Sequence, residues 1–178
     1  MKKMPLKKIP PEQLEILDTC QRIHKHAEEF YQCLSEMYHM NREIAKIWGL
    51  LAIDKCNHSD TYKMAYRLKG EGIKEIHIIP GMADNMLAKI KSIPAFDRST
   101  PPSVVDMLRF TIKMEESLKN VHFSLVVSFV HERDAALMAS SLNSSGTILH
   151  MMTEEYLNLT AVEPDSFDDF NKVPEHTT

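Results

Sequence analysis

Residues 17–37 read LDTCQRIHKHAEEFYQCLSEM. The apolar side chains of this stretch recur at steps of three and four residues, which is the spacing of one face of an α-helix. His24 stands in the middle of that apolar face. Because burying an isolated charge is costly, a titratable group at such a position requires a partner or a metal ion. The stretch therefore predicts a core helix with a polar group at its centre.

Three later stretches repeat this pattern, each with an apolar stripe that is interrupted by ionisable or amide side chains. These side chains are Lys55 and His58 within residues 44–65, Glu115 and His122 within 104–125, and Glu155 and Asn158 within 148–162. Four amphipathic helices bury their apolar faces most simply against one another. The sequence therefore predicts an all-α protein, a four-helix bundle with one shared polar site inside it.

Helix-breaking residues divide the chain between these stripes. Pro10 and Pro11 suit the first turn of a helix, Asn41 is a typical N-cap, and Ser99 or Thr100 caps the third long helix. The predicted helices span residues 11–38, 41–68, 82–90, 101–130, 131–142 and 147–162. The short helix 82–90 lies in a long crossover, 71–102. A basic extension, 1–10, precedes the bundle, 11–162, and an acidic flexible tail, 163–178, follows it.

Composition excludes several classes of protein. A net charge of −4 gives the chain no general attraction to nucleic acid. No apolar run is long enough to cross a membrane, and the basic start lacks the apolar segment of a secretory signal. The three cysteines, Cys20, Cys33 and Cys56, are odd in number and form no Cys-x-x-Cys pair. We therefore expect a cytoplasmic protein without membrane or nucleic-acid partners.

Distance from the first turn predicts which polar groups meet. His24 lies 16 residues before residue 40, and Lys55 and His58 lie 15 and 18 residues after it. In an antiparallel helix pair, equal distances from the turn give equal heights, here about 24 Å. These three side chains are therefore expected in one layer. By the same reasoning, Glu115 and Glu155, which lie symmetrically about residue 135, are expected to share a layer.

The polar positions also resemble the ligand pattern of the rubrerythrin and ferritin-like family, over roughly residues 12–162. Family helices one and three carry a Glu seven residues before a Tyr, and helices two and four carry Glu-x-x-His. Here Tyr31 follows His24, and His58 follows Lys55. Glu115 is retained in the third helix and Glu155 in the fourth. The resemblance implies a ferritin-like four-helix bundle, commonly a homodimer, whose family members hold two iron or manganese ions.

The departures from the family pattern suggest what has replaced the two metal ions. Lys55 stands where a bridging Glu belongs, and Asn158 stands where a His belongs. Our leading interpretation is that the Lys55 ammonium replaces the cations and pairs with Glu115 and Glu155. Lys55, His122 and Asn158 then form a buried polar network. On this interpretation the protein is a non-catalytic interaction or sensing module with a protein partner.

The alternative interpretation is a rebuilt, mononuclear site. His24, His58, Glu115 and Glu155 offer nitrogen and oxygen ligands to one iron, manganese or zinc ion. Such a site would make the chain a metal-binding redox protein. The sequence leaves open which interpretation holds and whether the protein is an enzyme. His122 is interpreted as a packing substitute for an aromatic ring rather than as a ligand.

Overall fold

The computed structural model describes residues 9–68, 72–94, 96–97 and 99–161. The predicted tail, 163–178, and the first eight residues of the predicted N-terminal extension lie outside the described residues. Ile9, also assigned to that extension, is buried in the core. The packed domain therefore begins before its first helix.

The first two helices form an antiparallel pair that confirms the predicted hairpin. Helix α1 spans Pro11–Met37 and α2 spans Arg42–Arg67. Pro11 occupies the first turn of α1, where its missing N–H costs nothing. The Asn41 side chain accepts a hydrogen bond from the backbone N–H of Ile44, so the predicted N-cap is confirmed. The pair buries its apolar stripes inward, as the periodicity predicted.

A two-stranded sheet corrects the all-α prediction. Strand β1 spans Ile73–His77 and strand β2 spans Val126–Phe129, and the two pair antiparallel. Helix α4, Val104–Ser124, therefore ends six residues before the predicted residue 130. Consecutive β-branched residues disfavour helix and fit a pleated, half-buried surface, which explains the change at Val126 and Val127. The described part of the chain is mainly α-helical with a small two-stranded sheet.

The remaining helices agree with the predicted order. They are α3 at Met82–Lys91, α5 at Glu132–Leu142 and α6 at Gly146–Thr160. Ser103 caps α4 by accepting a hydrogen bond from the N–H of Asp106, in place of the predicted Ser99 or Thr100. The prolines at 101 and 102 explain the shift, since a residue that precedes proline is disfavoured in helical conformation.

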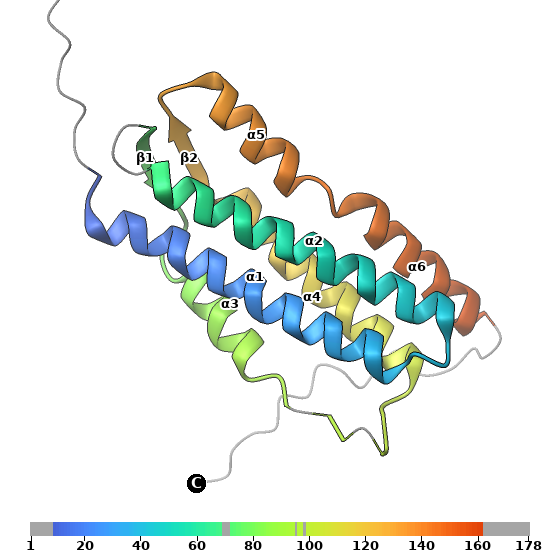
Figure 1. Cartoon of the computed structure of the whole chain (residues 1–178). Coiled ribbons are helices and arrows are strands. Elements are labelled where there is room, and N and C mark those ends of the chain that lie inside the picture. The colour runs from blue at the N-terminus through green and yellow to red at the C-terminus, as the bar shows by residue number, and fades with distance from the viewer. Residues whose placement is uncertain (1–8, 69–71, 95, 98, 162–178) are drawn as a thin grey trace, which may run out of the picture.

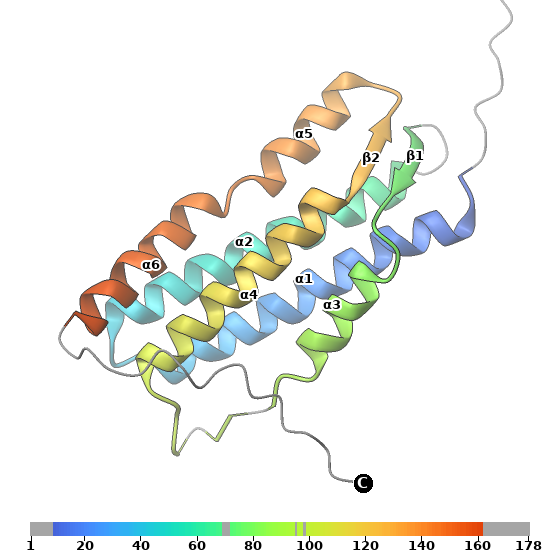
Figure 2. The same ribbon diagram turned by 180° about the vertical axis from the view of Figure 1, so that it is seen from behind.

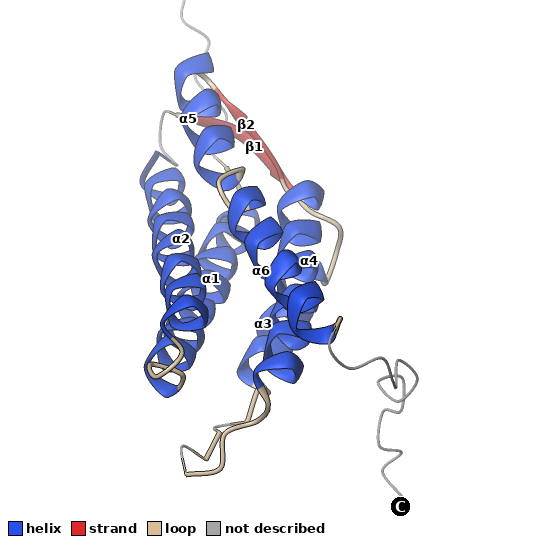
Figure 3. Ribbon diagram, turned by 90° about the vertical axis from the view of Figure 1, so that its right-hand side faces the viewer, coloured by secondary structure: helices blue, strands red, loops and turns tan. Residues whose placement is uncertain are grey.

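The helices lie side by side in one elongated body. After α2, the chain returns along the bundle through β1 and α3, so α4 runs parallel to α2 (Figures 1 and 2). Helices α5 and α6 together run back antiparallel to α4. Figure 3 shows both strands at one end of the bundle. Within the described residues, no helix is both long and apolar enough to cross a membrane.

Candidate metal centre

Three histidines from three helices meet inside the bundle. The ring centroid of His24 on α1 lies 5.1 Å from that of His58 on α2 and 4.7 Å from that of His122 on α4. The rings of His58 and His122 are 5.0 Å apart. One ring nitrogen of each lies within 4.8 Å of the other two. The predicted layer of His24 and His58 is confirmed, whereas His122 is a member that the packing interpretation missed.

In each of the three imidazole rings, Nε2 makes a hydrogen bond and Nδ1 makes none among the described residues. The Nε2 atoms of His24 and His122 lie 2.9 Å apart, so one ring donates its proton to the other. Nε2 of His58 donates to the backbone carbonyl of Ser141 at 3.0 Å, which leaves the lone pair of His58 on Nδ1. Among the described residues, no partner reaches the buried Nδ1 atoms of these three histidines. Buried polar atoms normally have hydrogen-bond partners, so these unpaired ring nitrogens indicate that the cluster can bind a further group.

The surroundings keep all three imidazoles neutral at physiological pH. Burial is the main cause, and it lowers the pKa of His58 to about 4 and that of His122 to about 3. Burial, together with His122, Lys55 and His58, also holds the pKa of His24 well below 6.5. A neutral imidazole keeps a free lone pair, which is the form that binds a metal ion.

A buried ion-pair network lies beside the histidines. The Lys55 ammonium donates to Oε2 of Glu115 at 2.7 Å and to Oδ2 of Asp54 at 2.9 Å. The second carboxylate oxygen of Glu115 accepts a hydrogen bond of 2.7 Å from the Tyr31 hydroxyl. Lys55 and Glu115 are only 1% and 4% exposed. The predicted pairing of Lys55 with Glu115 is therefore present, and Asp54 is its second carboxylate.

The turn between α5 and α6 closes this network from the other side. The hydroxyls of Ser144 and Ser145 donate to Asp54 at 2.5 and 2.6 Å. Burial alone would raise the pKa of Asp54, but Lys55, His58 and these hydroxyls hold it below its usual value. Asp54 lies four residues before His58, one helical turn away, and this i,i+4 spacing was the signal that could have placed it at the site.

Two predicted site residues lie elsewhere. Asn158 is exposed on α6, so its assignment to a buried network is wrong. Glu155 is half-buried, and no hydrogen bond or ion pair among the described residues joins it to the histidines or to Lys55. The strand β2 and helix α5 lengthen the path from α4, so Ser145 and not Glu155 reaches the height of Lys55. Glu155 lies ten residues further on, about 15 Å along a helix.

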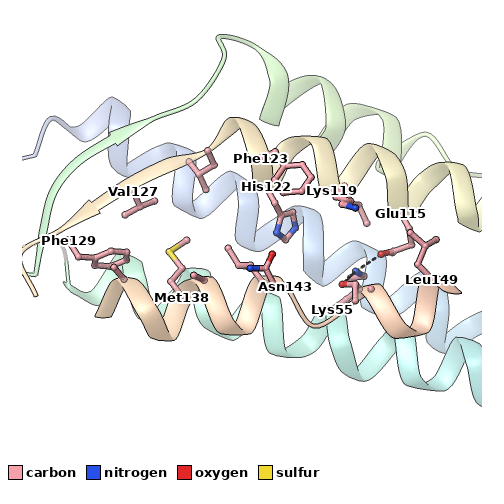
Figure 4. A pocket seen from close by; sticks show the side chains of 17 residues that line it. Lys55, Glu115, Lys119, His122, Phe123, Val127, Phe129, Met138, Asn143 and Leu149 are labelled. Atoms are coloured by element: carbon pink, nitrogen blue, oxygen red, sulfur yellow. Dashed lines mark hydrogen bonds and ion pairs between the residues drawn. The ribbon is translucent and has the colours of Figure 1, made fainter. Parts of the chain in front are cut away.

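A pocket of about 420 Å³ opens between α4, β2 and the α5–α6 segment. Figure 4 shows His122, Glu115 and Lys55 at one part of its wall, with the ion pair of Lys55 and Glu115 marked. Phe129 and Met138 lie at the other end, toward the sheet. His122 thus belongs both to the histidine cluster and to the wall of the pocket.

Comparison of the chain with models of protein families, with curated proteins and with solved structures gave no match.

Proposed function

We propose that this protein binds one divalent transition-metal ion through His24, His58 and His122. The observation that carries the proposal is the convergence of three neutral imidazoles, two buried and one half-buried, with one ring nitrogen of each within 4.8 Å of the others. A metal ion would take the place of the proton shared by His24 and His122. The bond from His58 to the Ser141 carbonyl is the kind that orients a metal-ligating histidine.

The ligand set favours particular metals. Imidazole nitrogen suits zinc, iron, copper and nickel, whereas manganese prefers carboxylate oxygen. Glu115 is engaged by Lys55 and Tyr31, and Glu155 is separate from the cluster, so the set is nitrogen-only. Burial raises the pKa of the nearby Cys20 thiol to about 12, which argues against a thiolate ligand. We therefore propose zinc or ferrous iron in preference to manganese.

A metal-free role is the second candidate, and one observation favours it. The Lys55 ammonium already pairs with two buried carboxylates, as expected if it replaces the cations of a dinuclear centre. In that case the histidines are structural, and the bundle is an interaction or sensing module. Removal of one partner from such a buried network is costly whatever the histidines do.

We also propose that the bundle is ferritin-like. In its support, the chain runs with α2 and α4 parallel and with a crossover that contains α3. Tyr31 and Glu115 occupy the positions that the family pattern gives to an aromatic residue and a carboxylate. The proposal would account for a polar site at mid-height in the bundle core.

The test is metal content, measured by elemental analysis on the untagged full chain after loading with zinc, iron or manganese. We expect close to one ion per chain for zinc or iron. His58→Ala and His122→Ala should abolish binding, whereas His150→Ala, at an exposed position on α6, should leave it unchanged. Visible absorption of bound Co²⁺ gives an independent readout of nitrogen coordination.

Folding of each variant is checked by circular dichroism, and His122→Phe replaces His122→Ala if the latter unfolds. Metal content far below one ion per chain under every loading would contradict the proposal and favour the metal-free module. Binding that survives both histidine variants would place the metal elsewhere, and would also contradict it.

A further inference from the structure

The pocket beside the histidine cluster has two chemically different ends. Its polar part is formed by Lys55, Glu115, His122, Asn143 and Ser145, and the exposed Lys119 also lines the pocket. Apart from these groups and Gly146, its wall is apolar and comes from α4, β2, α5 and α6, including Leu118, Phe129, Met138, Leu142 and Leu149. Ligand sites are typically cavities of this kind, mostly apolar with a few polar groups that orient the ligand. The shape of the pocket therefore suits a ligand with a small polar head and an apolar body.

The charges of the buried groups beside the pocket indicate which head group its ligand carries. Histidines that bind a metal ion do so as neutral imidazoles, and the Lys55 ammonium lies 2.9 Å from the carboxylate of Asp54 and 2.7 Å from that of Glu115. Without a metal ion the buried groups thus carry one excess negative charge. A divalent ion would change this to one excess positive charge, and a buried charge is costly unless it is paired. A monoanionic head group would bring the metal-loaded site to zero net charge. A dianion would leave it with one negative charge, and a cation would increase its positive charge.

Coordination specifies the same head group. Three histidines leave a fourth position of a tetrahedral metal ion for an outside ligand. His122 lies in both the cluster and the pocket wall, so a ligand in the pocket is next to that position. Oxygen is an ordinary ligand for zinc and ferrous iron.

We infer that the pocket binds a small amphipathic carboxylate, with its head group at the metal-loaded histidine cluster and its apolar chain or ring toward Phe129 and Met138. This inference rests on the proposed metal site. Because the carboxylate and the metal ion neutralise one another, each should strengthen the binding of the other by the same factor.

Decanoate is the probe, titrated calorimetrically into zinc-loaded and into metal-free full-length protein. We expect one decanoate per chain, bound to the loaded protein at least about tenfold more tightly than to the metal-free protein. Acetate tests the apolar tail, and decylamine tests the sign of the head group. Both should bind far more weakly than decanoate.

Two alanines on α5 provide a matched pair of variants. Ala139 lines the pocket, whereas Ala136 does not, and both are exposed. Ala139→Trp should fill the pocket and abolish decanoate binding without change in zinc content. Ala136→Trp adds the same side chain outside the pocket and should bind decanoate normally.

The outcomes separate this inference from the proposed function. Zinc bound at one ion per chain, with decanoate affinity equal in loaded and metal-free protein or unaffected by Ala139→Trp, would overturn the carboxylate site alone. Loaded protein that binds no decanoate would do the same. If no metal binds, the proposed function fails and this inference fails with it. Metal-dependent binding that Ala139→Trp removes and Ala136→Trp spares supports both.

Discussion

Lys55 shows how much the site depends on single residues. Its ammonium is buried and lies within hydrogen-bond distance of Asp54, Glu115 and Ser145. Such a network contributes little net stability when it is complete, because desolvation offsets the attraction of the charges. The network does fix the positions of α2, α4 and the α5–α6 turn relative to one another, because each of them supplies a charged or hydroxyl group to it.

Lys55→Met should destabilise the fold by about 3–5 kcal/mol, because it leaves the carboxylates of Asp54 and Glu115 buried without their cation. The loss should shrink as the pH falls and the unpaired carboxylates take up protons. Urea unfolding at neutral and acidic pH measures both effects. Lys63→Met, at an exposed position on the same helix, is the control. Equal stability of the two variants would contradict the network.

Two buried tyrosines allow a test of one hydrogen bond. The Tyr31 hydroxyl donates to Glu115, whereas no partner of the buried Tyr62 hydroxyl occurs in the described part of the chain. Tyr31→Phe should cost about 1.5–3 kcal/mol, the range for a hydrogen bond to a charged group. Tyr62→Phe should be neutral or stabilising, since it removes an unsatisfied hydroxyl. Thermal unfolding of the two variants compares them directly, and the reverse order would refute this assignment.

At the scale of elements, the α5–α6 segment completes the site. The carbonyl of Ser141 binds His58, and the hydroxyls of Ser144 and Ser145 bind Asp54. The end of α5 and the turn that follows it place these three polar groups against α2. A single uninterrupted helix would present side chains only, and would leave its carbonyl groups in its own hydrogen bonds.

Two glycines at helix starts should respond oppositely to alanine. Gly81 precedes α3 with a φ of 75°, a conformation that costs an alanine about 1 kcal/mol. Gly146 begins α6, and a Cβ there meets no atom within 4 Å. Gly146→Ala should therefore stabilise the fold by about 0.4–1 kcal/mol through a less flexible unfolded chain. Chemical unfolding distinguishes them, and a stabilising Gly81→Ala would contradict the backbone argument.

At the scale of the whole molecule, the histidine cluster makes the free energy of unfolding depend on pH. Below pH 6.5 the unfolded chain takes up protons at its histidines, while the folded protein keeps His58 neutral to about pH 4 and His122 to about pH 3. The unfolded state then binds more protons, so acid favours unfolding. The free energy of unfolding of metal-free protein should fall from pH 6.5 toward pH 4, by up to about 1.4 kcal/mol per pH unit for each histidine.

Urea unfolding across this range measures the slope. His122→Phe keeps an aromatic ring and removes one titrating group, so its slope should be shallower by up to one proton. His150→Ala, at an exposed site, should leave the slope unchanged. Identical slopes for wild type and His122→Phe would show that His122 is not held neutral by the fold.

Local patterns in the sequence determined the helices and half of the site. The α1–α2 hairpin, the N-cap at Asn41 and the layer that joins His24 to His58 were all predicted correctly. Helix periodicity depends on neighbouring residues, and a short turn sets the register of a hairpin by simple counting. These predictions needed no knowledge of the rest of the chain.

Apart from Glu115, whose pairing with Lys55 was predicted, only the tertiary structure decided which groups from the second half of the chain complete the site. The pairing of β1 with β2 ends α4 early, and the path through α5 brings Ser145 to the network in place of Glu155. His122 joins the histidines because α4 packs with that face toward α1 and α2. The register between distant segments depends on the whole path between them, and a strand pairing across about 50 residues leaves no local signal in either strand.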